Sequence, residues 1–203
     1  MNPVTIRSVE RADLPACLSV IHESFRTVAE DFGLTPENCP KHTAFQPLCY
    51  LETQMEWGWH LYALYAEKKI IGYMSLAKEG ETTYELHNLA VLPAYRHNGF
   101  GTLLLNYAKE TVRSLGGTTI QIGIIEESTL LKNWYIANGF TPTVTKKFPH
   151  LPFTSGYLEW KGTLTRKTAF SPSAVWLRSK TKFCWYGIPT EPPKTDSLSP
   201  AAT

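Results

Sequence analysis

The sequence predicts an α/β protein with a mixed central sheet and flanking helices. Two observations lead to this fold class. Helical and extended hydrophobic patterns follow one another in the order β, α, α, β, β, β, α, β, α, β, β. The strand, helix and strand between residues 85 and 125 require parallel neighbours, whereas the hairpins before and after them require antiparallel pairs. Both kinds of pairing are therefore expected within one sheet.

The helices are predicted from apolar stripes and from the residues at their ends. The first follows the N-cap residue Asp13 and ends at Gly33, a residue type that favours the position after a helix. The second begins at residue 46 or 47, with Pro47 in its first turn, and ends by Gly58. Together the predicted helices cover residues 14–32, 46–57, 98–115 and 129–137.

The strands are predicted from alternating or β-branched residues that stand between turn signals. A hairpin is expected around a turn at Lys68 and Lys69, although this turn lacks the usual Asn-Gly or Asp-Gly pair. The predicted strands cover residues 3–8, 59–67, 70–77, 85–92, 118–125, 140–148 and 156–160.

The composition is that of a globular protein. Of its 203 residues, 43% are hydrophobic and 19% are charged, which suits one domain with a sizeable core. A net charge of +2 gives no reason to expect a nucleic-acid partner. No secretory h-region and no run long enough to cross a membrane is visible, so no membrane partner and a cytoplasmic location are expected.

The cysteines predict neither a metal site nor a disulfide framework. Cys17, Cys39, Cys49 and Cys184 form no Cys-x-x-Cys pair, and no histidine stands at zinc-ligand spacing from them. Free thiols in a reducing compartment are the simpler interpretation.

The composition changes near residue 165, where Ser, Thr, Pro and Lys begin to dominate. Residues 191–200 are typical of disorder. Apolar clusters at 174–177 and 183–186 could pack on the domain, on a partner or nowhere. We therefore expect a domain over residues 1–164 and a largely disordered C-terminal tail over residues 165–203.

The stretch from Glu85 to Leu115 is the most informative part of the chain. A buried strand ends at Pro93, a turn with two glycines follows at residues 96–101, and a helix comes next. The first amides of a helix have no internal partner, so they can bind an anion in front of it. The glycines are expected to take up positive φ and to let the backbone come close, while Arg96 adds a positive charge. A pyrophosphate fits this arrangement.

Two common phosphate motifs are excluded by the residues after the turn. A nucleotide-triphosphate loop needs Gly-Lys-Ser/Thr, but Gly101 is followed by Thr102 and Leu103. A dinucleotide fingerprint needs a third glycine where Leu104 stands. An ordinary tight corner between strand and helix is the remaining structural alternative.

Arg-x-x-Gly-x-Gly between a strand and a helix resembles motif A of the GCN5-related N-acetyltransferases. The resemblance covers roughly residues 4–160. It implies the acyl-CoA N-acyltransferase (GNAT) fold, in which two central parallel strands splay apart around the pantetheine of acetyl-CoA. It also implies that acetyl-CoA is the acyl donor. The residues that it assigns to the cofactor are Leu89, Ala90, Val91, Leu92, Arg96, His97, Asn98, Gly99, Phe100, Gly101 and Thr102.

The resemblance also implies catalytic candidates. Acetyl transfer to an amine needs a base for the amine proton, and bases of this family often lie on the strand before the phosphate loop. Glu85 and His87 share one face of that strand. Their alternatives are a surface glutamate and a structural histidine. Tyr135, in a stretch that resembles motif B, is the candidate acid for the departing thiolate, with an aromatic core residue as its alternative.

The acceptor is not identified by the sequence. Aromatic residues at Phe45, Tyr50, Trp57, Trp59 and 148–153 could form a wall for an amine, or simply belong to the core. The prediction is an N-acetyltransferase for a primary amine of a small molecule or peptide, by direct attack. The alternative is a non-enzymatic acyl-CoA sensor whose tail docks a partner. A homodimer is left open.

Overall fold

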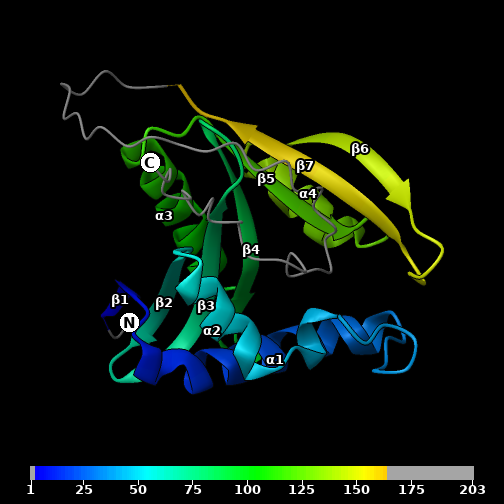
Figure 1. The fold of residues 1–203 in the computed structure, drawn as a ribbon, viewed down its shortest axis with the longest axis horizontal. Helices are drawn as coiled ribbons and strands as arrows, with labels where there is room; N and C mark the ends of the chain where they lie inside the picture. Colours follow the sequence, from blue (N-terminus) through cyan, green and yellow to red (C-terminus); the bar gives the residue numbers. More distant parts are fainter. Residues whose placement is uncertain (1–2, 164–203) are drawn as a thin grey trace, which may run out of the picture. The chain divides into compact units, whose positions relative to one another are not determined.

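The computed structural model describes residues 3–163 and shows a seven-stranded sheet with helices on both faces (Figure 1). The strand order is β1-β2-β3-β4-β5-β7-β6. β4 and β5 are parallel, and all other neighbours are antiparallel. The predicted mixed sheet and element order are confirmed. The predicted tail lies outside the described residues.

The bounds of the elements lie close to the predicted ones. The strands are β1 (Val4–Ser8), β2 (His60–Ala66), β3 (Lys69–Lys78), β4 (Thr83–Val91), β5 (Thr119–Ile125), β6 (Thr141–Lys147) and β7 (Thr154–Lys161). The helices are α1 (Leu14–Asp31), α2 (Leu48–Glu56), α3 (Phe100–Ser114) and α4 (Thr129–Ala137), with short 3₁₀ turns η1 (Arg11–Asp13), η2 (Thr43–Phe45) and η3 (Pro93–Tyr95).

The start of α2 and the turn between β2 and β3 differ from their predictions. Pro47 is the N-cap of α2 and not part of its first turn, because its extended backbone (ψ 163°) precedes the helix. The hairpin turn between β2 and β3 falls one residue earlier than expected, at Glu67 and Lys68, since Ala66 pairs with Lys69. Glu67 takes a φ of 56° there, which a tight two-residue turn requires.

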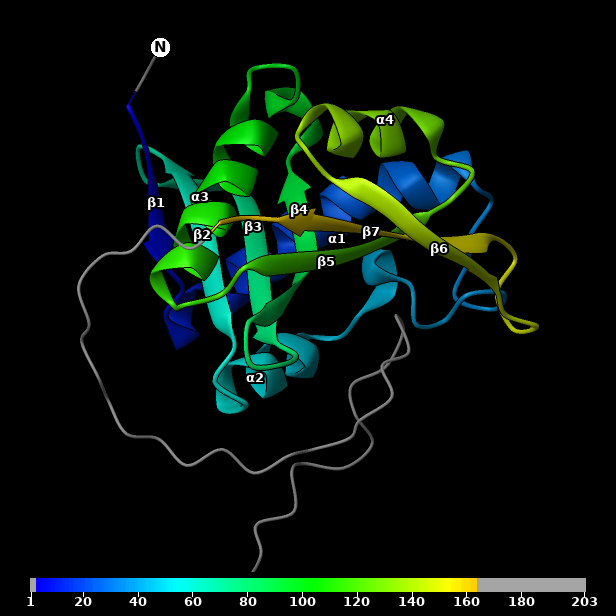
Figure 2. The same ribbon diagram turned by 90° about the horizontal axis from the view of Figure 1, so that it is seen from above.

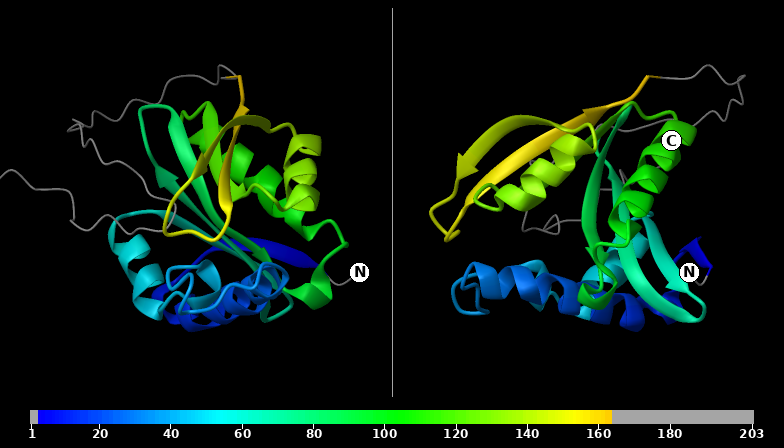
Figure 3. Two further views of the ribbon diagram at one scale, coloured as in Figure 1. Left: turned by 90° about the vertical axis from the view of Figure 1, so that its right-hand side faces the viewer. Right: turned by 180° about the vertical axis from the view of Figure 1, so that it is seen from behind.

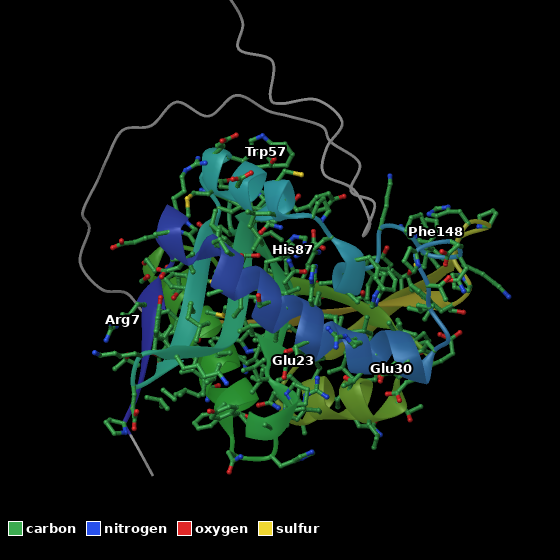
Figure 4. The ribbon with its side chains drawn as sticks, turned by 90° about the horizontal axis from the view of Figure 1, so that it is seen from below. Arg7, Glu23, Glu30, Trp57, His87 and Phe148 are labelled. Carbon is green, nitrogen blue, oxygen red and sulfur yellow. The ribbon has the colours of Figure 1, made fainter. Side chains whose placement is uncertain are left out.

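The helices form two layers on the sheet. α1 and α2 cover one face, in front of the strands in Figure 4, whereas α3 lies on the other face together with α4 (Figure 2). β4 directs side chains to both helix layers, because alternate side chains of a strand point to opposite faces. Its residues Tyr84 and Leu86 are buried, and a Cβ on Gly117, just beyond α3, would meet the Tyr84 ring. Glu85 and His87 therefore face the side of α1 and α2.

The two parallel strands pair over a short distance only. Register partners join residues 83–85 of β4 to residues 119–121 of β5. Beyond this point β4 continues along β3, whereas β5 continues along β7. Figure 1 shows the two strands separating, and the right-hand view of Figure 3 shows the same from behind. The splaying that the resemblance implied is present, and it frees one edge of β4 from Leu86 onward.

A bulge interrupts β4 at the start of this free edge. Ser75 pairs with His87 and Tyr73 pairs with Ala90, so β4 contains one residue more than β3 between these pairs. Asn88 takes a φ of 52°, which asparagine tolerates better than most residues. The bulge follows Glu85 and His87, so these two residues still share a face, as expected.

Candidate active site

The turn between β4 and α3 has the geometry of an anion site. Gly99 is the N-cap of α3, with a φ of 79°, and the first intrahelical bond runs from the Leu103 amide to the Gly99 carbonyl. The amides of residues 100–102 therefore have no intrahelical partner and point to the space before the helix. The Asn98 side chain holds the turn by donating to the carbonyl oxygens of Tyr95 and Arg96.

The two glycines of the turn differ in backbone conformation. A Cβ on Gly99 would meet nothing within 4 Å, so its positive φ is what requires glycine. Gly101 lies in the first turn of α3, and a positive φ is absent there. A Cβ on Gly101 would lie 3.4 Å from the Trp134 ring of α4. That distance is an ordinary van der Waals contact. The prediction of positive φ is confirmed for Gly99 and wrong for Gly101, whose backbone is helical.

Arg96 is bound to the protein itself. Its guanidinium donates to the Val91 carbonyl at 3.3 Å, to Thr27 Oγ1 at 3.0 Å and to the Ser24 carbonyl at 2.7 Å. Thr27 and Ser24 belong to α1, so this side chain connects the turn with the helix on the opposite layer. The sequence led us to expect a charge directed at a pyrophosphate, and did not indicate these partners.

Glu85 and His87 lie side by side on β4. His87 Nε2 is 3.5 Å from Glu85 Oε2, and the side chains are 19% and 12% exposed respectively. Burial raises the pKa of Glu85 to about 7. Burial lowers the pKa of His87 to about 4. At neutral pH the histidine is therefore uncharged, and Glu85 is divided between its acid and its carboxylate.

The Nε2 atom of His87 is buried without a hydrogen-bond partner among residues 3–163. Its distance to Glu85 is that of a close contact and not of a formed hydrogen bond. A neutral imidazole and a titrating carboxyl, placed together, can pass one proton between them or to a third group.

Aromatic rings border this pair on the side of β2. The Trp59 ring stacks on His87 at 4.7 Å with an interplanar angle of 27°, and Trp57 lies 6.3 Å beyond Trp59. Figure 4 shows His87 between α1 and α2, with Trp57 at the end of α2. Of the aromatic residues considered for an acceptor wall, Trp57 and Trp59 join the catalytic candidates.

The other aromatic candidates lie elsewhere. Phe45 packs against His42 at 5.9 Å, and Phe148 packs against His150 at 5.8 Å. Phe148 is remote from Trp57 in Figure 4. Tyr50 is half-buried on α2.

Tyr135 is a buried residue of α4, 6% exposed. Its ring makes edge contacts with Trp134 at 4.8 Å and with Phe140 at 5.3 Å. Burial raises the pKa of its hydroxyl, so the group stays protonated and can act only as a donor of its proton. The contacts with Trp134 and Phe140 are enough to explain why an aromatic ring is buried at this position.

Sequence reasoning missed two residues of this region. Asn88 forms the bulge, and asparagine inside an apolar strand was the available signal, since it is rare there and tolerates positive φ. Glu79 follows β3, and burial together with the charge of Glu85 raises its pKa to about 7. Its place beside Glu85 depends on strand register, which no local pattern reveals.

The described part of the chain contains neither a cluster of metal ligands nor a helix that could span a membrane. Residues 3–163 contain no group of three or more His, Cys, Asp or Glu side chains arranged to hold a metal ion. Cys17, Cys39 and Cys49 form no disulfide within this range. None of the helices within this range has the length and apolar character needed to cross a membrane.

Solved structures with the same fold are acetyltransferases. The ribosomal-protein-S18-alanine N-acetyltransferase of Escherichia coli matches 83% of this chain and 100% of its own, with a TM-score of 0.65 and 15% identity. The PaiA N-acetyltransferase of Thermoplasma acidophilum, solved with coenzyme A, matches 79% and 99%, with a TM-score of 0.63 and 19% identity. A Salmonella typhimurium protein solved with its cofactor acetyl-CoA matches 83% and 98%, with a TM-score of 0.59 and 20% identity.

Sequence comparison adds a family and one relative. An uncharacterised N-acetyltransferase of Bacillus licheniformis is 38% identical over 58 residues, which are 24% of this chain and 36% of the relative. The chain thus aligns with about a third of that relative's length. The family model of the GNAT acetyltransferases matches residues 26–140, which span the splayed strands, the turn between β4 and α3, and α4. The chain therefore belongs to the acetyltransferase (GNAT) family.

Proposed function

We propose that this protein is an N-acetyltransferase that moves the acetyl group of acetyl-CoA to a primary amine of a small molecule or peptide. The observation that carries the proposal is the position of Glu85 and His87. They lie together, half-buried, on the strand that leads into the phosphate turn, at the point where β4 leaves β5. A base placed there is next to the space that the splayed strands leave for a thioester.

The residues of the turn fit the phosphates of acetyl-CoA. A pyrophosphate would be held by the amides of residues 97–101 and by the hydroxyl of Thr102, at a helix N-terminus that favours negative charge. The amide of Arg96, which the sequence had included, donates to the Pro93 carbonyl at 3.2 Å instead. The guanidinium of Arg96 lies behind the turn and adds its charge from there. The backbone of residues 89–91, on the free edge of β4, would hold the pantetheine and donate to the developing oxyanion. The amide of Leu92 donates to the Ile71 carbonyl of β3 at 2.9 Å and so faces away from this edge.

Proton movement in the reaction can be assigned to two residues. Glu85 accepts a proton from the acceptor amine, directly or through a water molecule, since its pKa of about 7 leaves much of it ionised at neutral pH. The neutral amine nitrogen then bonds to the acetyl carbon, the carbon–sulfur bond breaks, and the remaining extra proton on the nitrogen leaves to water. The departing thiolate takes a proton from the Tyr135 hydroxyl or from water. His87 is the second candidate for the base.

A thiol-release assay tests this function. Release of coenzyme A from acetyl-CoA would be measured with polyamines, arylalkylamines, aminoglycosides, amino acids and N-terminal peptides, for the wild type, Glu85→Gln and Tyr135→Phe. We expect release that depends on one amine class and falls about 100-fold or more in Glu85→Gln, as loss of a general base does. Glu81→Gln, at an exposed carboxylate, is the matched control and should behave as the wild type.

Two results would count against the proposal. Equal release in all variants would support an acetyltransferase activity, but it would show that neither Glu85 nor Tyr135 is catalytic. Absence of release with every amine, while acetyl-CoA binding is confirmed in the same samples, would favour a non-enzymatic acyl-CoA-binding module.

A further inference from the structure

The sheet face that carries Glu85 also carries a second carboxylate. Glu79 follows the last residue of β3, and its amide donates to the carbonyl of Thr83, the first residue of β4, at 2.9 Å. Ala77 is the register partner of Glu85. Glu79, two residues beyond Ala77, is therefore the diagonal neighbour of Glu85 on the same face, with Cβ atoms roughly 7 Å apart.

No lysine or arginine of the described residues neutralises these two carboxylates. Within residues 3–163, no lysine or arginine nitrogen lies within 4.0 Å of either one. Glu159, which joins the same row of the sheet through Gln121, differs in this respect because Lys161 lies 2.8 Å from it. Two half-buried carboxylates with no lysine or arginine partner in this range favour a ligand that brings positive charge.

An aromatic wall stands beside the carboxylate pair. Trp59 directly precedes His60, the register partner of Leu76, so its neighbour on β3 is the small residue Ala77. Trp59 therefore lies in the same row of the sheet as Ala77 and Glu85, and its ring stacks on His87 in the next row of that face. Apolar ring faces pack against an alkyl chain, and they also attract an ammonium group.

We propose that the acceptor is a small alkyl diamine, whose reacting nitrogen meets Glu85 while its second ammonium group pairs with Glu79. The inference rests on the proposed function and names the acceptor class of the same site. A single carboxylate suffices as base, so the second has a separate task. A thin alkyl chain reaches two half-buried carboxylates along the Trp59 ring, whereas a peptide backbone would have to be desolvated there.

Matched substrates test the second ammonium group. Thiol release from acetyl-CoA would be followed with 1,4-diaminobutane and with butylamine, which has the same chain and one amine only. The full chain is assayed well above pH 7, where Glu85 is ionised. We expect kcat/KM to be about tenfold or more higher for the diamine, beyond the factor of two from its two equivalent amines, because a hydrogen bond to a charged group is worth that much.

Variants locate the effect at Glu79. In Glu79→Gln the ratio of kcat/KM between diamine and butylamine should fall close to two, and added salt should lower the wild-type ratio through screening. Glu81→Gln, an exposed carboxylate on the same connection, should keep the wild-type ratio. Glu79→Gln removes a charge that repels Glu85, so the fold is not expected to suffer, and a thermal melt checks this.

Each other outcome has a definite meaning. Equal use of both amines, or an equal fall for both in Glu79→Gln, overturns the diamine inference. Release with peptides and not with diamines also overturns it, and leaves the proposed acetyltransferase intact. Absence of release with any amine, with acetyl-CoA bound, overturns the proposed function and this inference together.

Discussion

Burial gives Glu85 a pKa near neutrality, and this property can be read in the pH dependence of the reaction. A carboxylic acid must lose its proton before it can accept one. With a pKa of about 7, kcat/KM should rise as the pH increases through 7 and level off above it. In Glu85→Gln this rise should disappear. A rising limb that persists with the same midpoint in Glu85→Gln would assign the base to another group.

The same carboxyl should also affect stability, with a defined sign. Its pKa is raised in the folded state, so folding favours the protonated form, and stability falls as the pH rises from the unfolded value of about 4.3 through the folded value. Glu85→Gln removes this penalty. We expect it to increase the free energy of unfolding by up to about 3 kcal/mol at pH 8 and to change it little at pH 4. Urea denaturation at both values measures the difference. An identical change at both would show that the effect is not ionisation.

At the scale of one element, the phosphate turn depends on backbone conformation. Gly99→Ala forces a side chain into a left-handed backbone, which costs about 1–2 kcal/mol. Gly58 offers a matched control, because its φ is 74° and a Cβ there also meets nothing within 4 Å. Both alanine variants should lose similar stability in thermal melts. Only Gly99→Ala should weaken coenzyme A binding in calorimetry, and equal binding by both variants would contradict the assigned turn.

The hydrogen bond between Arg96 of the turn and Thr27 of α1 connects two elements. Thr27 accepts a hydrogen bond from Arg96 at 3.0 Å from a helix on the other layer. If Arg96 positions the turn through this contact, Thr27→Val should raise the coenzyme A Kd severalfold, and its effect should not add to that of Arg96→Gln. Arg26→Gln, an exposed charge of the same helix, is the control. Full additivity of the two variants would mean that Arg96 acts on phosphate directly.

Local elements could be predicted from the sequence because their signals are local. The apolar stripe of α1, the strand before Pro93 and the glycine turn need only neighbouring residues to be recognised. The contact from Arg96 to Ser24 spans 72 positions, and the diagonal relation of Glu79 to Glu85 depends on register. The bulge at Asn88 likewise shifts pairing between strands. The glycine turn and the position of Glu85 on the strand before it were therefore predictable, whereas the surroundings that determine their chemistry were not.

At the scale of the whole molecule, the short pairing of β4 with β5 limits how firmly the two halves of the sheet are joined. β1 to β4 form one antiparallel ladder and β5, β7 and β6 form another, and the sheet joins them through three register pairs. A molecule bound along the free edge of β4 would touch both ladders and act as a strand that the polypeptide does not supply. At a concentration 100 times its Kd, such a ligand adds about 2.7 kcal/mol to the free energy of unfolding. The acyl donor would then be a structural component of the sheet, and the lifetime of the folded chain would follow the supply of that metabolite.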